Sequence, residues 1–277
     1  MANGEGIIFG IIIGIIAYVC LDDGKGIQKY AIEGLKEDKT VKSKNSGIWI
    51  FGTILTSIYM FIQWAALFFA PINLIAPLEG IGLVVLLIFS YYVLKEKITN
   101  IEIIGVVLII VGTVIITLFN PNTGEINATD FNLNIFLIFS LTILAIEIIA
   151  IFFSKFKDYK LAGLIIGVTA GTLMAFQTFT KRVTAIPEYF LIFTGIMFAV
   201  AVSTLAVTQF AFTKANANVV VPCFTSASII LATLLGAIAL NEVIEPIQIL
   251  GIVSIVFGVI CLTAFKKEEI RKSVDLE

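Results

Sequence analysis

Long apolar runs separated by short polar stretches constrain the fold of this chain more than any other feature. A helix needs about twenty apolar residues to cross the roughly 30 Å hydrocarbon layer of a membrane, and these runs have about that length. Because hydrocarbon offers no hydrogen-bond partner, each crossing segment must satisfy its own backbone groups, which makes the runs helices. A β-barrel would need alternating apolar and polar residues, and the run from Ile101 to Leu118 shows no alternation. The sequence therefore predicts an all-α polytopic membrane protein.

Composition supports this class and excludes others. Of the 277 residues, 59% are hydrophobic and 14% are charged, whereas a soluble domain has about 45–50% apolar and about 25% charged residues. The net charge of −2 gives no reason to expect a nucleic-acid partner. The absence of histidine excludes histidine-dependent catalysis, and no phosphate-binding Gly-x-x-x-x-Gly-Lys-Ser/Thr loop is present. We therefore expect neither an enzyme nor a cofactor or nucleotide, and the lipid bilayer is the first partner.

The apolar runs predict nine transmembrane helices. Thr99 and Glu102 form a capping box that opens the fourth helix, and Pro246 suits the first turn of the ninth. The first six residues lack the basic region of a signal peptide, so we expect the first run to be a transmembrane helix. The predicted helices cover residues 6–34, 47–69, 72–94, 100–118, 132–154, 160–184, 187–212, 217–240 and 246–265.

The basic residues are distributed unequally between the two ends of these helices. Of the 18 Lys and Arg residues, fourteen fall at one end, and only Lys181 and Arg182 fall toward the other, while Lys25 and Lys29 lie within the first helix. Cytoplasmic loops of membrane proteins carry the excess of Lys and Arg. We therefore expect a cell-membrane protein with its N-terminus outside and its C-terminus in the cytoplasm.

Two stretches of the chain resemble each other. Asn73 to Pro77 matches Asn218 to Pro222, and Glu96, Gly105 and Gly112 match Glu242, Gly251 and Gly258 at nearly the same offset. Gly10-x-x-x-Gly14 in the first helix is echoed by Gly163-x-x-x-Gly167 in the sixth. Because the copies start five helices apart, the second copy must run in the opposite direction, which is typical of transporters with alternating access. The sequence thus predicts inverted repeats over 1–118 and 160–277, joined by a fifth helix within 119–159.

The residues of these stretches resemble a known family. The segment from Phe69 to Pro121 contains Phe-Ala-Pro-x-x-Leu-Ile-Ala-Pro-Leu, Tyr-Tyr-Val-Leu-Lys-Glu-Lys and Gly-x-x-Leu-Ile-Ile-Val-Gly-Thr-Val. It resembles the NIPA-type magnesium transporters of the drug/metabolite transporter superfamily, as do the Asn218–Pro222 stretch and Gln28-Lys29. The resemblance implies nine helices, an outside N-terminus and transport of Mg²⁺. Glu79 stands where that family has glycine, and Asp22-Asp23 stand where it has small residues.

Four carboxylates lie where the predicted helices place them within the membrane. They are Asp22, Asp23, Glu79 and Glu147. A charged side chain in the membrane costs about 2.5–3.5 kcal/mol on insertion scales and is usually functional, and oxygen ligands suit a hard cation such as Mg²⁺. The four therefore form a candidate metal site for transported Mg²⁺. The alternatives are a turn at Asp22-Asp23 that ends a short first helix, a position of Glu79 near the outer interface, and an internal ion pair of the Asp residues with Lys25 or Lys29.

Other polar residues and prolines are candidates for supporting roles. Asn73, Asn218, Gln63 and Gln209 could line a path or hydrogen-bond between helices. Pro77 and Pro222 would free backbone carbonyls early in their helices, or merely fit a first turn. Glu96 and Glu242 lie at loop junctions, where each could have a gating role or could be solvated or packed.

The sequence leaves several functions to distinguish. The first hypothesis is a secondary transporter or facilitator of a divalent cation, Mg²⁺ above others. The second is an exporter of amino acids or other small polar metabolites, as in the EamA-like relatives, with the carboxylates carrying coupling protons. An intramembrane enzyme built on Asp22 and Asp23, and a non-transporting scaffold or receptor, are the remaining classes. A homodimer is left open.

Overall fold

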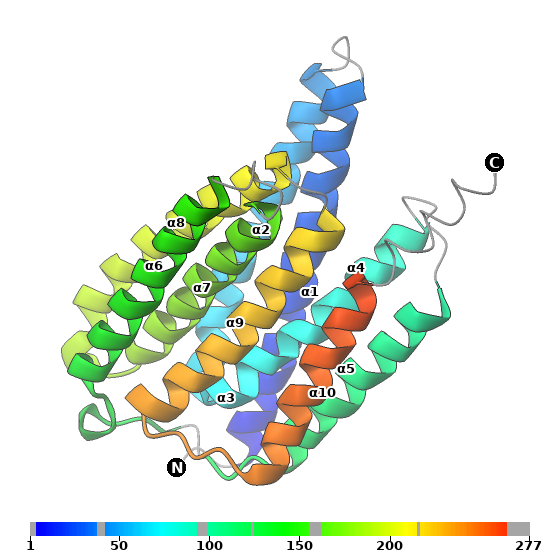
Figure 1. Ribbon diagram of the computed structural model, residues 1–277. Helices are drawn as coiled ribbons and strands as arrows, with labels where there is room; N and C mark the ends of the chain where they lie inside the picture. The colour runs from blue at the N-terminus through cyan, green and yellow to red at the C-terminus, as the bar shows by residue number, and fades with distance from the viewer. Residues whose placement is uncertain are drawn as a thin grey trace.

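The computed structural model describes residues 4–37, 42–92, 99–122, 125–155, 162–214 and 217–264. These residues form a bundle of long helices with loops at its two ends (Figure 1). Glu96 lies outside the described residues, and of Lys29, Asn218 and Pro222 only the helical backbone is described. The helices are α1 (Gly4–Glu37), α2 (Lys42–Phe69), α3 (Ile72–Ile75), α4 (Glu79–Tyr92), α5 (Asn100–Leu118), α6 (Leu133–Lys155), α7 (Ala162–Val183), α8 (Phe190–Lys214), α9 (Ala217–Ala239) and α10 (Pro246–Ala264).

The predicted third helix, residues 72–94, is wrong as a single uninterrupted helix. The chain forms α3, then a tight 3-10 turn over Ala76–Leu78, then α4 from Glu79. Pro77 has no N–H and its ring clashes with the carbonyl one turn back, so the regular α-helical ladder is interrupted there. Glu79 consequently begins a helix of its own.

Two predicted helix starts are confirmed. The Thr99 hydroxyl accepts from the Glu102 N–H, and the Glu102 carboxylate accepts from the Thr99 N–H at 2.7 Å, which completes the capping box of α5. Pro246 is the first residue of α10, where a missing N–H costs no hydrogen bond.

Five helical stretches are long and apolar enough to cross a membrane: Glu5–Gln28, Asn45–Phe69, Asn100–Leu118, Leu133–Phe152 and Pro187–Ala211. Three shorter apolar stretches are Ile72–Val85, Cys223–Ala239 and Pro246–Cys261. Helix α7 is rich in Gly and Thr and carries Lys181 and Arg182, and nearly all its described side chains from Ile166 to Thr184 are buried or half-buried. An interior helix contacts other helices rather than lipid, so it needs fewer large apolar side chains.

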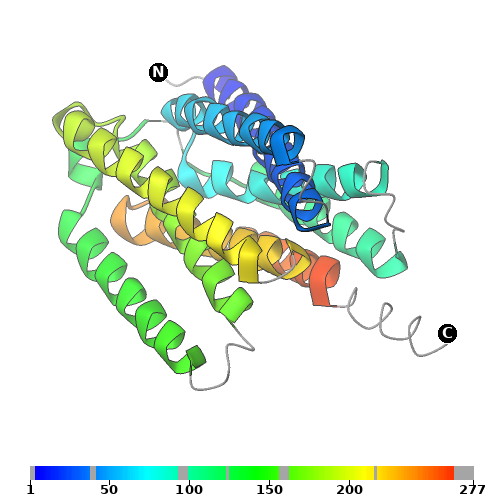
Figure 2. The same cartoon turned by 90° about the horizontal axis from the view of Figure 1, so that it is seen from above.

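Helices pack both with their neighbours in sequence and with distant helices. α1 packs along α2 and α4, α7 packs along α8 and α9, and α5 packs against α10. Seen from above, α6 stands at the edge of the bundle (Figure 2), where it contacts α7 and α9. The interior between these helices holds the buried polar residues described below.

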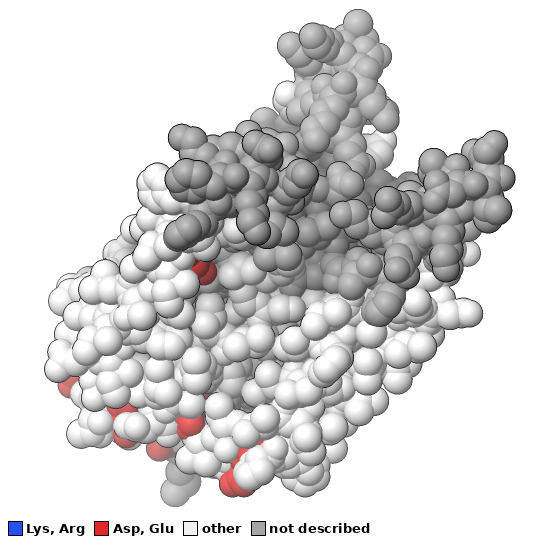
Figure 3. All heavy atoms as spheres, in the orientation of Figure 1, with Lys and Arg blue, Asp and Glu red and all other residues white. Residues whose placement is uncertain are grey.

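The outer surface is mainly apolar. On the face shown in Figure 3, the visible Asp and Glu side chains lie mostly along the lower edge, and most of the described surface above them is uncharged. Exposed large side chains such as Ile138, Leu191 and Leu250 cover the helices. A surface this apolar fits a lipid environment, and the fold is that of a polytopic α-helical membrane protein.

Candidate functional site

Helix α1 carries the first two candidate carboxylates in its interior. It runs without interruption through Asp22, Asp23 and Gly24, so the alternative of a short helix ending there is wrong. Gly24 lies against Gly52 and Thr56 of α2, where any Cβ would collide with the α2 backbone. The glycine thus permits α1 and α2 to lie close together and fixes the rotation of α1.

This rotation separates the two aspartates. Asp22 is fully buried, whereas Asp23 is only half-buried. Adjacent residues of a helix point about 100° apart, so only one of them can face the α4 side of α1. Asp22 does so, because a Cβ added to Gly82 of α4 would clash with Asp22 Oδ2.

Lys25 joins Asp22 to Glu79. The Lys25 ammonium lies 2.9 Å from Asp22 Oδ1 and 3.8 Å from Glu79 Oε1. Asp22 and Glu79 are 0% exposed and Lys25 is 4% exposed, so this ion pair is shielded from solvent. Contact of Glu79 with water is therefore wrong, whereas its position at a helix end agrees with the start of α4 at this residue. The alternative of an internal ion pair with Lys25 is confirmed.

Several buried oxygen atoms of this cluster accept no hydrogen bond. They are Asp22 Oδ2 and both carboxylate oxygens of Glu79, which make no hydrogen bond of ordinary geometry. The hydroxyls of Thr225 and Ser228 lie beside the Glu79 carboxylate as weak donors. A buried carboxylate oxygen without a donor is costly and marks a place where a ligand or water is needed. The cluster thus presents free acceptor oxygens of the kind that a hard cation binds.

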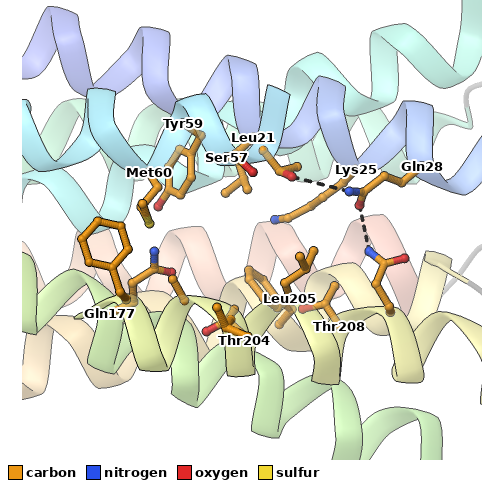
Figure 4. Close-up of a pocket in the computed structure, with 16 residues that line it drawn as sticks. Leu21, Lys25, Gln28, Ser57, Tyr59, Met60, Gln177, Thr204, Leu205 and Thr208 are labelled. Carbon is orange, nitrogen blue, oxygen red and sulfur yellow. Dashed lines mark hydrogen bonds between the residues drawn. The ribbon is translucent and has the colours of Figure 1, made fainter. Parts of the chain in front are cut away.

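A cavity of about 210 Å³ adjoins the cluster. It lies between α1 and α2 on one side and α7, α8 and α9 on the other, and Lys25 points into it (Figure 4). Its polar wall is made of amides and hydroxyls, and Gln28 Oε1 accepts from Gln209 Nε2 at 2.9 Å across it. The other polar lining residues are Thr56, Ser57, Gln177, Thr204 and Thr208.

A second polar layer lies next to this cluster. Gln63 Nε2 donates to the Tyr18 hydroxyl at 2.7 Å and to the Thr178 hydroxyl at 3.2 Å. The Lys181 ammonium donates to Gln63 Oε1 at 2.6 Å and lies over the Tyr59 ring, 4.8 Å from its centre. This layer, built from α1, α2 and α7, lies on the side of the interior nearest the α7 C-terminus.

Glu242 joins the loop after α9 to two other segments. Its carboxylate accepts from the N–H groups of Ile72 and Asn73, each at 2.9 Å, and so caps the start of α3. Arg182 Nε lies 3.7 Å from Glu242 Oε1. Burial raises the pKa of the Glu242 carboxyl, while Arg182 and the two N–H groups lower it. Glu242 is therefore a buried packing and capping residue rather than a solvated one.

The backbone explains how Glu242 reaches this position. Asn241 adopts a left-handed conformation (φ 54°), and the Glu242 N–H donates to the Gly236 carbonyl at 3.0 Å. With the left-handed Asn241, this bond reverses the chain at the end of α9. Asn73 adds a bond from its Nδ2 to the Val243 carbonyl at 3.0 Å.

Glu147 lies apart from the other carboxylates. It is 8% exposed on α6, where its Oε1 accepts from the Thr172 hydroxyl of α7 and its Oε2 has no partner. It lines a cavity of about 530 Å³ between α6, α7, α9 and α10, whose other walls are mostly apolar. The structure therefore places Glu147 and Asp23 outside the Asp22–Glu79 cluster.

Two basic residues of these clusters, Lys181 and Arg182, were not predicted as site residues. Lys181 and Arg182 served only to orient the chain, although two adjacent cations at the end of an otherwise apolar helix are themselves unusual. The Asp22–Lys25 spacing of three residues, which places both on one helix face, indicated the ion pair. Nothing in the sequence around Gly82 indicated its contact with Asp22.

No group of three or more His, Cys, Asp or Glu side chains that could hold a metal lies within the described residues. Asp22 and Glu79 together offer two carboxylates. Magnesium keeps several of its waters and is commonly held by one or two carboxylates, so the pair fits a hydrated ion in transit better than a resident one.

A helical bundle of this kind, with an apolar exterior and a buried ionic cluster beside an internal cavity, is an integral membrane protein with charged groups in its interior. The family model of the magnesium transporter NIPA matches residues 5–187. The chain therefore belongs to the NIPA magnesium transporter family.

Individual relatives are more distant. NIPA-like protein 2 of Mus musculus is 29% identical over 159 residues, which cover 55% of this chain and 42% of that protein. The probable magnesium transporter NIPA1 of Arabidopsis thaliana is 27% identical over 160 residues, which cover 56% of this chain and 48% of that protein. The matched part is thus less than half the length of each of these relatives. No solved structure matches the chain.

Proposed function

We propose that this chain is a secondary transporter or facilitator that moves a divalent cation, Mg²⁺ above others, across the cell membrane by alternating access. The observation that carries the proposal is the convergence of Asp22 and Glu79, two fully buried carboxylates from different helices, beside a cavity that is lined in part by amides and hydroxyls. Buried charge within a membrane protein is costly and marks ion pathways. The names of the relatives, which are probable magnesium transporters, favour the same cargo.

Alternating access requires two related halves, and the helix contacts support the inverted repeat. A Cβ at Gly14 of α1 would meet Leu78 and Ile75, and a Cβ at Gly167 of α7 would meet Val220 and Cys223. Val220 and Cys223 stand in the same relation to Pro222 as Ile75 and Leu78 do to Pro77. These matching contacts support the proposed halves, residues 1–118 and 160–277, with α6 as the connection between them.

The contact of α5 with α10 supports a two-fold relation between the halves. In the repeat, Gly105 corresponds to Gly251 and Gly112 to Gly258. A Cβ at Gly112 would lie 2.5 Å from the Gly251 carbonyl, and a Cβ at Gly258 would lie 2.6 Å from the Gly105 carbonyl. Gly112 thus contacts Gly251, the counterpart of Gly105, and Gly258, the counterpart of Gly112, contacts Gly105 itself. Such reciprocal contacts are typical of an isologous interface.

Polar contacts between the halves are also made by residues that correspond in the repeat. Gln28 lies as far beyond Gly14 as Lys181 lies beyond Gly167. Gln63 of α2 contacts Lys181 of α7, and Gln209 of α8 contacts Gln28 of α1. The second helix of each half thus reaches the first helix of the other half through a glutamine. Such cross-contacts lie where two halves would rock against each other.

The proposed orientation, with the N-terminus outside, assigns the two ends of the interior. The Lys181–Gln63 layer and the Arg182–Glu242 contact then lie on the outer side of Asp22 and Glu79. The cavity, with Gln28 and Gln209, lies on the cytoplasmic side. The arrangement corresponds to an outwardly closed state, and an interior-negative potential would favour entry of a divalent cation by about 4.6 kcal/mol per 100 mV.

Flux measurements on the purified chain in proteoliposomes test the proposal. We expect Mg²⁺ uptake by the wild type, and we expect Asp22→Asn and Glu79→Gln each to reduce it strongly because each removes a ligand charge. Glu188→Gln, which neutralises an exposed glutamate, serves as the matched control. Uptake that persists in the Asp22→Asn/Glu79→Gln double variant would contradict the proposed pathway.

The amide and hydroxyl lining of the cavity favours a second candidate, an exporter of a small polar metabolite. In that case the carboxylates would carry coupling protons. A panel of polar metabolites, tested with and without a proton gradient, separates the two. Counterflow of a labelled metabolite that is insensitive to Mg²⁺ would favour the second candidate.

A further inference from the structure

Lys25 stands between the cavity and the two carboxylates. Its ammonium contacts Asp22 at 2.9 Å and Glu79 at 3.8 Å, and the side chain also lines the cavity. The ring of Phe224, another cavity-lining residue, lies 4.1 Å from the same nitrogen. Because Lys25 lines the cavity and neither carboxylate does, a cation that enters from the cavity meets Lys25 before it reaches Asp22 or Glu79.

Lys25 and a divalent cation cannot use the same oxygen atoms at once. Magnesium binds carboxylate oxygens at about 2.0–2.1 Å, and a magnesium ion at Asp22 Oδ1 would lie within a few ångströms of the ammonium. Two like charges at that separation in a buried site repel each other strongly. Occupation of the pair by a cation therefore requires the ammonium to move away.

The cavity offers the ammonium a place to go. The Phe224 ring already faces it, and an aromatic face attracts an ammonium. Gln28 and Gln209 present amide groups to the same cavity. The lysine stem is flexible, so the head can turn toward the cavity without movement of α1.

We propose that Lys25 is a tethered cation that competes with the transported divalent cation for Asp22 and Glu79. This inference rests on the proposed function. Lys25 holds the carboxylates when no cargo is bound, weakens the binding of cargo, and promotes its release by returning to the oxygens. It is a specificity-determining and positioning residue, whose removal should tighten binding while slowing turnover.

The test compares Mg²⁺ binding by calorimetry and Mg²⁺ uptake into proteoliposomes for variants of the full chain. We expect Lys25→Met to bind Mg²⁺ about tenfold more tightly, a change of about 1.4 kcal/mol, and to have a lower KM and a lower kcat. Lys25→Arg retains the charge and should stay near the wild-type affinity. Lys25→Gln, a polar replacement, provides a second neutral variant if Lys25→Met does not fold.

A charge-removal control distinguishes competition from a general electrostatic effect. Lys181→Met removes an equally buried ammonium whose described polar partner is Gln63 rather than a carboxylate. We expect it to tighten Mg²⁺ binding much less than Lys25→Met does. Equal tightening in both variants would overturn the proposed competition.

The remaining outcomes are also decisive. If folded Lys25→Met and Lys25→Gln bind Mg²⁺ no more tightly than the wild type, Lys25 only holds the carboxylates in place and the inference fails. If the wild type neither binds nor transports Mg²⁺, the proposed function fails and the inference fails with it. Wild-type uptake thus separates the two failures.

Discussion

Arg182 Nε lies 3.7 Å from Glu242 Oε1, which joins the last turn of α7 to the loop after α9. The same carboxylate caps α3 through the N–H groups of Ile72 and Asn73. Arg182 also donates to the Leu67 carbonyl of α2 at 2.7 Å. One buried ion pair therefore connects four segments at one end of the bundle.

Removal of Glu242 should destabilise the protein strongly. Glu242→Ala leaves the buried Arg182 charge without its carboxylate partner and two backbone N–H groups without an acceptor, and breaking a buried pair costs about 3–5 kcal/mol. We expect the midpoint of thermal unfolding in detergent to fall well below that of the wild type. Glu245→Ala, in the same loop but exposed, is the control and should change little. Equal midpoints for the two variants would show that the Glu242 contacts do not stabilise the fold.

The glycines between α5 and α10 should tolerate no side chain. A Cβ at Gly112 would lie 2.5 Å from the Gly251 carbonyl, so Gly112→Ala must push the two helices apart. Overpacking of this kind costs about 1–3 kcal/mol, which thermal unfolding in detergent would detect. Gly195→Ala on α8 is the matched control, because nothing lies within 4 Å of its added Cβ. A Gly112→Ala midpoint equal to that of Gly195→Ala would contradict the close approach.

The sequence predicted most of the fold for a simple physical reason. Helix positions follow from apolar length and from local signals, and the Thr99–Glu102 box and Pro246 act within one turn of the chain. The change of helix at Pro77 does not follow from the apolar pattern, because the sequence is equally apolar on both sides of the proline.

The candidate site was less predictable because it depends on how the helices are rotated and paired. Asp22 and Asp23 are adjacent and chemically alike, yet only Asp22 faces Gly82. Glu79 and Glu147 are both carboxylates within apolar helices, yet one meets Lys25 and the other meets Thr172. No local pattern distinguishes these cases, since the contacts are made by residues from other helices.

Gln63 and Lys181 should depend on each other. Gln63→Leu removes the amide oxygen that accepts from the buried Lys181 ammonium and leaves that charge poorly solvated, which should destabilise the fold by several kcal/mol. Lys181→Met in the same background removes the charge and should restore much of the loss. A double-mutant cycle of thermal unfolding measures the coupling. Additive effects of the two changes would contradict direct dependence.

Glu147 provides a test of whether all four carboxylates belong to one cation path. Its free Oε2 and the largely apolar cavity beside it should admit a hydrophobic carbodiimide, which forms an acyl-urea adduct with buried carboxyl groups. We expect mass spectrometry to find the adduct at Glu147 and to find none there in Glu147→Gln. Because Glu147 lies apart from Asp22 and Glu79, Mg²⁺ should not protect it from modification, whereas any adduct at Glu79 should be reduced by Mg²⁺. Protection of Glu147 by Mg²⁺ would instead place it on the cation path, and the separation of the two sites in this structure would then describe one state of a moving carrier.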